Sequence, residues 1–150
     1  MRKQQITAFY LETLLLIVVF VGIILVLTRV FGIARQESRS AKLLTDAVCL
    51  AENAAEAVSA SDSPEELLEI LDGGGNATLA EKDGHPVVTV SYDTDMTPDP
   101  AGPLRLDVTW EPSASAAGTM VDSVITARYA GQEEPVYSIR TAVFLREVSP

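Results

Sequence analysis

Residues 8–27, AFYLETLLLIVVFVGIILVL, form a run of twenty positions that is apolar almost throughout. A helix of about 20 apolar residues is long enough to cross the roughly 30 Å hydrocarbon core of a bilayer. The run contains one acid, Glu12, near its start. A carboxylate is costly in hydrocarbon and is retained where it has a partner. The run therefore predicts a membrane-spanning helix whose Glu12 pairs with a positive charge, from another chain or from this chain's own processed N-terminus. The alternative is an acid near the membrane interface whose side chain reaches water.

The charge of the 150-residue chain is unevenly distributed, and its length is enough for about one domain. Residues 1–58 hold six Lys/Arg and five Asp/Glu, whereas residues 59–150 hold five Lys/Arg and sixteen Asp/Glu. An acidic half with few cations argues against nucleic-acid binding. The sequence offers no nucleophile–base–acid set, no metal-ligand cluster and no glycine-rich phosphate loop. We therefore predict neither an enzyme nor a bound cofactor.

The apolar run differs from a cleaved secretory signal in two respects. It is longer than the usual signal core, and no A-x-A pattern follows it, although Arg2 and Lys3 fit a charged signal start. A retained anchor is the favoured interpretation. Charge alone leaves its orientation open, because basic residues also follow the run, at Arg29, Arg35, Arg39 and Lys42.

The helical pattern continues beyond the run. Residues 33–58 contain neither proline nor glycine, and their apolar residues recur at spacings of three and four, which is typical of one stripe along a helix. We predict one helix from about residue 6 to about residue 59. It comprises a transmembrane part, 9–31, after a basic leader, 1–8, and an amphipathic continuation, 32–59. The stripe consists of Leu43, Leu44, Ala47, Val48, Leu50, Ala51, Ala54, Ala55 and Val58.

The remainder of the chain, 60–150, predicts a short helix and a set of strands. Ser63, Pro64 and Glu66 have the spacing of a capping box with proline at the first helical position, and glycines 73–75 are expected to end that helix. Strands are expected at 78–82, 86–92, 104–110, 119–129 and 136–145, with a tight turn at Asp83-Gly84 and loops at 94–103 and 112–118.

The predicted fold class is α+β. An antiparallel sheet of about four to five strands needs cover on its apolar face, and the alanine-rich second half of the long helix is the available partner. Residues 41–59 and 60–150 are therefore expected to form one globular head outside the membrane.

Three features occur together in this chain: a short basic leader, the sequence Phe9-Tyr10-Leu11-Glu12 opening an apolar helix, and an amphipathic continuation followed by a small sheet. In this combination the chain resembles type IV pilins and type II secretion pseudopilins. In that family a prepilin peptidase cuts after a glycine, and the new first residue is often an N-methylated phenylalanine. A glutamate at the fifth mature position then pairs with the N-terminal amine of a neighbouring subunit.

The resemblance implies that Phe9 is the first mature residue and that Glu12 is the assembly glutamate. Ala8 stands where the family has its cleavage-site glycine, and Glu12 is fourth counted from Phe9 but fifth counted from Ala8. Two alternatives follow: the peptidase accepts a variant site, or the chain stays uncleaved in the inner membrane. Gly22 is expected either to let the helix bend, as in the family, or to reflect the frequency of glycine in membrane helices.

Two further features suggest weaker sites. Asp93, Asp95 and Asp99 offer alternating oxygen ligands for calcium, which some pseudopilins bind, but a solvated acidic loop is favoured because the glycine and closing glutamate of an EF-hand are absent. Cys49 is the single cysteine, so no intramolecular disulfide forms. We expect Cys49 to be a small buried residue, with an intermolecular disulfide as the alternative.

The resemblance implies a structural filament subunit, major or minor, of a type IV pilus or pseudopilus. Its implied partners are other pilin-like subunits, the lipid bilayer, a prepilin peptidase and an assembly platform, with the N-terminus cytoplasmic and the head outside. Adhesion, motility, protein secretion and DNA uptake in competence share this architecture. The alternative is a single-span membrane-anchored accessory or binding module that never polymerises.

Overall fold

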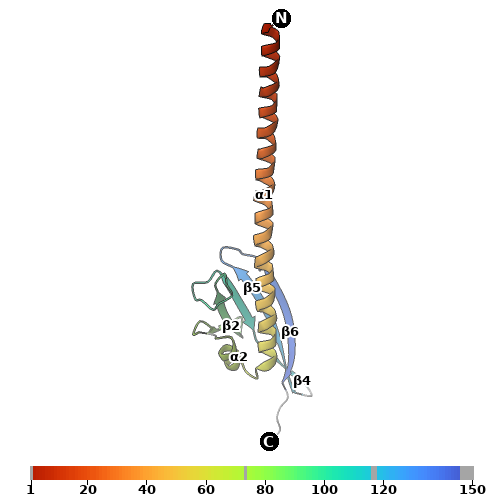
Figure 1. Cartoon of the computed structure of the whole chain (residues 1–150). Helices are drawn as coiled ribbons and strands as arrows, with labels where there is room; N and C mark the ends of the chain where they lie inside the picture. Colours follow the sequence, from red (N-terminus) through yellow and green to blue (C-terminus); the bar gives the residue numbers. More distant parts are fainter. Residues whose placement is uncertain (1, 73, 116–117, 146–150) are drawn as a thin grey trace. The chain divides into compact units, whose positions relative to one another are not determined.

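The structure is a computed structural model that describes residues 2–72, 74–115 and 118–145, with the side chains of residues 2–8 outside the description. The chain divides into two compact units, Met1–Ala41 and Lys42–Pro150. One helix, α1 (Arg2–Ala60), runs through the boundary between the two units, and it is drawn from red to yellow in Figure 1. The single helix predicted from about residue 6 to about residue 59 is confirmed, and it begins at Arg2.

In the first unit, α1 has apolar side chains on every side. All the large apolar residues from Phe9 to Ile33 are exposed, with 46–69% of their surface accessible. A helix that is hydrophobic all round requires an apolar environment on all sides. Within the first unit, the described residues leave these side chains uncovered.

In the second unit, α1 buries one stripe. The predicted spacing of three and four is confirmed, because the buried residues are Ala47, Leu50, Ala51, Ala54, Ala57 and Val58. Leu44, expected in the stripe, is 47% exposed. The expectation that Cys49 is buried is wrong, since its side chain is exposed. Cys49 follows Ala47 by two positions, a rotation of about 200°, which turns it to the opposite side of the helix.

The second helix, α2 (Pro64–Leu71), has the predicted cap. The Ser63 Oγ accepts a hydrogen bond from the Glu66 N–H at 3.2 Å, and the Glu66 Oε2 accepts one from the Asp62 N–H at 2.8 Å. The helix stops before the glycines, Gly73 being outside the described residues. Asp72 forms the C-terminal cap, and its Oδ1 accepts hydrogen bonds from the N–H groups of Asn76 and Ala77 at 2.7 and 3.0 Å. These bonds hold the pKa of the Asp72 carboxyl below its ordinary value of 3.8.

The sheet is antiparallel and contains all five predicted strands with one more. Its described strands are β1 (Thr78–Lys82), β2 (His85–Tyr92), β3 (Leu104–Thr109), β4 (Glu111–Ser115), β5 (Gly118–Tyr129) and β6 (Tyr137–Leu145). The order is β1-β2-β3-β5-β4, and β6 pairs with the free side of β5. The predicted turn at Asp83-Gly84 is confirmed, with φ of 55° and 84° at its two residues, as a type I′ turn requires.

The additional strand, β4, corrects the loop expected over residues 112–118. The pairs Leu104↔Tyr129 and Glu111↔Asp122 share one register, so β3 and β4 lie in line along β5. Between them the Thr109 Oγ1 accepts a hydrogen bond from the Val124 N–H at 2.9 Å. Pro112 suggested a loop, but proline is tolerated in an edge strand, and among the described strands β4 pairs only with β5. Residues 116–117 lie outside the described part of the chain.

One face of the sheet forms the core of the second unit. Alternate residues of the strands turn inward and contact the buried stripe of α1 and Leu67 of α2 in a single cluster, and Figure 1 shows the yellow end of α1 lying across this face. The predicted α+β architecture, a long helix on an antiparallel sheet, is therefore present. This core also includes Trp110, which lies between β3 and β4, and the strand residues Val88, Val90, Tyr92, Leu104, Leu106, Val108, Val121, Ile125 and Ala127.

Candidate membrane and assembly site

The first candidate site is the apolar surface of α1. Its most apolar window has a mean hydropathy of 3.0, and none of that window is buried within the chain. By length and composition this helix, near the N-terminus, is able to cross a membrane. The surface also exceeds by far what a monomer in water leaves uncovered.

Glu12 lies on this surface without a charged partner. Its side chain is exposed, and among the side chains that the structure describes none forms an ion pair with it. The neighbouring Thr13 differs, because its Oγ1 donates a hydrogen bond to the Phe9 carbonyl at 2.9 Å. That hydroxyl is satisfied inside the helix and tolerates hydrocarbon. Glu12 is thus an acid in this run that no described side chain neutralises.

The residues predicted for leader processing and bending lie in one regular helix. The backbone of Ala8 belongs to α1, its side chain being outside the description, and the Phe9 and Tyr10 rings meet edge to face at 6.4 Å between centroids. α1 is helical on both sides of Gly22. A Cβ added at Gly22 would meet no atom within 4 Å. Packing within the chain therefore does not require glycine at this position.

The loop between β2 and β3 uses its aspartates to hold its own backbone. The Asp93 Oδ1 accepts hydrogen bonds from the N–H groups of Asp95 and Thr97 at 2.8 and 2.9 Å, and the Asp99 Oδ1 accepts one from the Ala101 N–H at 2.9 Å. Among the described residues no group of three His, Cys, Asp or Glu side chains is placed to hold a metal ion. Asp93, Asp95 and Asp99 are not brought together as a ligand set.

The same loop makes one very close approach to β2. A Cβ on Gly102 would collide with the carbonyl group of Tyr92 and with the backbone nitrogen of Asp93. The Gly102 N–H donates to the Asp99 carbonyl at 2.9 Å, which fixes the loop in this position. The absence of a side chain at residue 102 is what allows the loop to close on the strand.

A second candidate site lies on the outer face of the sheet and was not found from the sequence. It is a cavity of about 490 Å³, which we call the basic pocket. Its charged lining residues are Lys82, Arg105, Asp107 and Arg128. The alternation of buried and exposed residues in β3 places Arg105 and Asp107 on the polar face. The signal that went unused is that this face gathers most of the few cations of an acidic head.

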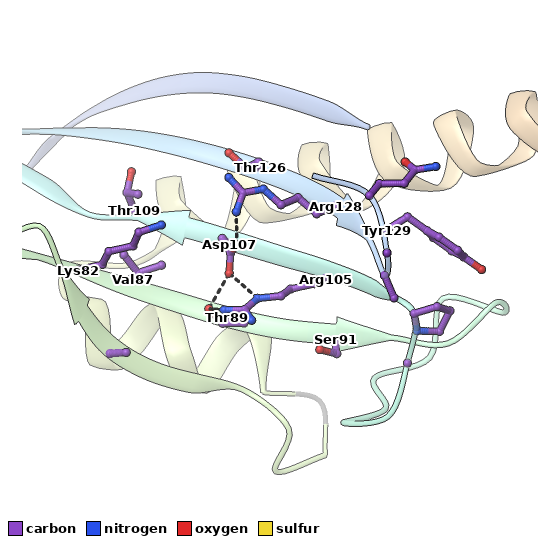
Figure 2. A pocket seen from close by; sticks show the side chains of 16 residues that line it. Lys82, Val87, Thr89, Ser91, Arg105, Asp107, Thr109, Thr126, Arg128 and Tyr129 are labelled. Carbon is purple, nitrogen blue, oxygen red and sulfur yellow. Dashed lines mark hydrogen bonds and ion pairs between the residues drawn. The ribbon is translucent and has the colours of Figure 1, made fainter. Parts of the chain in front are cut away.

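Figure 2 shows Asp107 at the centre of the basic pocket, between two guanidinium groups. The Asp107 Oδ1 accepts hydrogen bonds from the Arg105 Nε at 2.9 Å and the Thr89 Oγ1 at 2.7 Å, and its Oδ2 lies 3.7 Å from an Arg128 Nη. The described chain thus offers two separate surfaces, one apolar and one basic. Comparison with protein-family models, with curated proteins and with solved structures finds no match for the chain.

Proposed function

We propose that this chain is a structural subunit of a filament of the type IV pilus or pseudopilus kind, held in the membrane by α1 before assembly. One observation carries the proposal. A single helix leaves its first part uncovered and apolar with one unpaired acid, Glu12, and buries a stripe of its second part in a folded head. A helix built only as an anchor has no need of that acid.

The apolar surface of α1 suits two environments in turn. In the bilayer, lipid chains cover the side chains from Phe9 to Ile33, and in a filament the same side chains pack against α1 helices of other subunits. Lipid is as apolar as leucine, so this exchange is driven by close packing and by polar contacts between helices. The head of each subunit keeps its own core during the exchange, because its buried stripe lies in the second unit.

Glu12 supplies the polar contact. Two unit charges 4 Å apart attract by about 4 kcal/mol at an effective dielectric constant of 20. Desolvation offsets much of that gain, and the net contribution to affinity is small. Leaving one charge without its partner in an apolar environment has a larger effect, because it destabilises the complex by about 3–5 kcal/mol. Glu12 therefore acts mainly by selecting a register in which it meets the N-terminal amine of the next subunit.

This mechanism requires a free amine close to Glu12 and therefore removal of the leader. Cleavage between Ala8 and Phe9 places the amine three residues before Glu12 in the mature chain. The proposed orientation has Arg2 and Lys3 in the cytoplasm before cleavage and the head outside. Assembly then moves α1 out of the bilayer into a filament at the cell surface.

The test is the variant Glu12→Ala in the full chain, with Glu37→Ala as the matched control, since Glu37 is an exposed acid of α1 outside the apolar run. We expect Glu12→Ala to remain in the membrane fraction and to disappear from sheared filaments, and Glu37→Ala to assemble normally. Normal filament yield from Glu12→Ala would rule out the pairing role.

Mass spectrometry of the mature N-terminus separates the filament subunit from a non-polymerising anchored module. The filament proposal predicts loss of the leader up to Ala8, with Phe9 as the first residue and a methyl group on its amine. An intact Met1 on surface-sheared protein would contradict the processing step. An intact Met1 together with no sheared protein at all would favour the anchored module.

A further inference from the structure

The basic pocket concentrates positive charge on an otherwise acidic head. Residues 59–150 contain five Lys/Arg, and three of them, Lys82, Arg105 and Arg128, line this one cavity. The pocket also contains one acid, Asp107, whereas fifteen of the sixteen Asp/Glu of residues 59–150 lie elsewhere. The pocket therefore has a net positive charge, whereas the rest of the head is mostly acidic.

The arrangement of these cations is unfavourable for the isolated chain. Arg105 and Arg128 are direct cross-strand partners in the β3–β5 register, and like charges opposite each other destabilise a sheet. The single carboxylate of Asp107 balances the charge of only one of these two guanidinium groups. Lys82 has no ion pair among the described residues, and the Arg128 Nε is buried with no hydrogen-bond partner in the described chain. The pocket thus retains donors and positive charge for an acidic ligand.

The acidic segment that fits best is α2. Its Glu65 and Glu69 are exposed, and Glu66 is exposed as well but accepts the capping hydrogen bond from Asp62. The helix carries no Lys/Arg, and Ile70 is 47% exposed. An exposed helix face with carboxylates suits a cavity whose lining includes cations and the apolar Ala80 and Val87. Two other acidic segments fit less well. Asp93 and Asp99 are occupied by their own loop, and Glu133 and Glu134 follow Gln132 on the pocket's own rim.

The α2 of the same copy is held away from the pocket. Its Leu67 belongs to the core cluster with Val88 and Val90, on the inner face of the sheet, whereas the pocket is lined by Val87, Thr89 and Ser91 of the outer face. Successive residues of β2 point to opposite faces. Any contact between α2 and the pocket therefore joins two molecules.

We propose that the basic pocket receives the acidic face of α2 from a second copy of this chain. The two surfaces are different patches of one molecule, so the contact is head-to-tail and propagates as an open chain of heads when it does not close into a ring. The proposal rests on the proposed filament function and deepens it, because it names the contact between heads in addition to the contact between α1 helices.

The first test is charge reversal in the full chain, read as the yield of sheared filaments. Arg105→Glu is expected to lower the yield about tenfold or more, as for the loss of one side of an interfacial charge pair. The matched control Arg140→Glu makes the same charge change at an exposed site of β6 outside the pocket and is expected to assemble normally. Adding Glu69→Arg to Arg105→Glu restores the pairing between copies and is expected to recover the yield. Arg105→Glu filaments at wild-type yield would overturn the proposal.

The second test does not depend on filaments. Full chains in membranes, half of them labelled with ¹⁵N, are treated with a carbodiimide, which joins an amine to a carboxylate that it touches. We expect mixed-isotope links from Lys82 to Glu65 or Glu69. Links from Lys82 to other segments, or to anionic lipid alone, would overturn the assignment to α2. The expected links in protein that forms no filaments would support the head contact and sink the filament function. If circular dichroism shows that Arg105→Glu does not fold, Lys82→Glu makes the equivalent charge reversal at an exposed position of the same pocket.

Discussion

The two parts of α1 have the same backbone conformation and opposite surroundings. From Phe9 to Ile33 the large apolar side chains are exposed on all sides, whereas from Ala47 to Val58 only one stripe is apolar and that stripe is buried. The side chains differ in size as well, because the first part is rich in branched and aromatic residues and the second part in alanine. Large side chains suit a helix surrounded by lipid or by other helices, and small ones let a helix approach its own sheet. The difference shows that one helix combines a surface that the described chain leaves uncovered with a stripe that it buries in its own fold.

The largest expected effect comes from charging the first part of the helix. An arginine at the centre of a spanning helix costs about 3 kcal/mol, and each apolar residue contributes about half a kcal/mol in the opposite direction. Val19→Arg alone is therefore expected to stay in the membrane, and the triple variant Leu16→Arg, Val19→Arg, Ile23→Arg to leave it. Extraction at alkaline pH measures the difference.

The matched control places three arginines on the exposed side of the second part, as Glu52→Arg, Asn53→Arg and Ser59→Arg. This variant is expected to remain membrane-bound. Retention of the first triple variant in the membrane would show that residues 9–33 do not hold the chain there.

A smaller effect is expected from enlarging the buried stripe. Ala54 is fully buried, and overpacking a core costs about 1–3 kcal/mol. Ala54→Leu is expected to lower the melting midpoint of the head by roughly 5–12 °C, measured by the near-ultraviolet circular dichroism of Trp110. Asn53→Leu, one position along and exposed, should leave the midpoint unchanged. Equal melting of the two variants would contradict the placement of the stripe.

A still smaller effect on stability is expected from Asp72, which stabilises the head through hydrogen bonds rather than apolar burial. The pKa of Asp72 is lowered by the N–H groups of Ala77 and Asn76, so its ionised form stabilises the folded state. This contribution is complete above pH 3.8, the ordinary value, and is lost as the pH falls through the lowered pKa of the folded state. Asp72→Asn should melt earlier than the wild type at pH 7, with the gap narrowing below pH 4. A gap independent of pH would exclude the charge as its cause.

The smallest effect is expected from comparing two positions on opposite sides of the second part of α1, and the changes are expected to leave the fold intact. The exposed Cys49 should react with a maleimide in the folded protein. In a Cys49→Ser background, Ala51→Cys should react only after unfolding, because position 51 is fully buried. Mass spectrometry of the labelled chain gives both rates. Similar rates would mean that the two positions are not on opposite sides of the helix.

Local sequence patterns predict most helices and strands of the head. The features that they do not predict depend on which strands pair and in which register. The spacing of apolar residues places α1, and the Asp83-Gly84 turn fixes the first hairpin. Strand β4 was not predicted because it contains Pro112. Whether a proline lies in an edge strand or in a loop depends on which strand pairs beside it. The basic pocket also depends on which strands pair. Lys82, Arg105 and Arg128 are far apart in the sequence, and only the pairing of β1, β2, β3 and β5 brings them to one cavity.

The close approach at Gly102 makes the loop between β2 and β3 unequally tolerant of change. Any side chain at this position would push against the backbone of Tyr92, whose ring lies in the core, so a substitution here reaches the interior directly. The exposed positions of the same loop, such as Thr94 and Asp95, carry no such constraint. The loop is therefore a place where exposed side chains can change while its path over the sheet stays fixed by Gly102 and by the hydrogen bonds of Asp93 and Asp99.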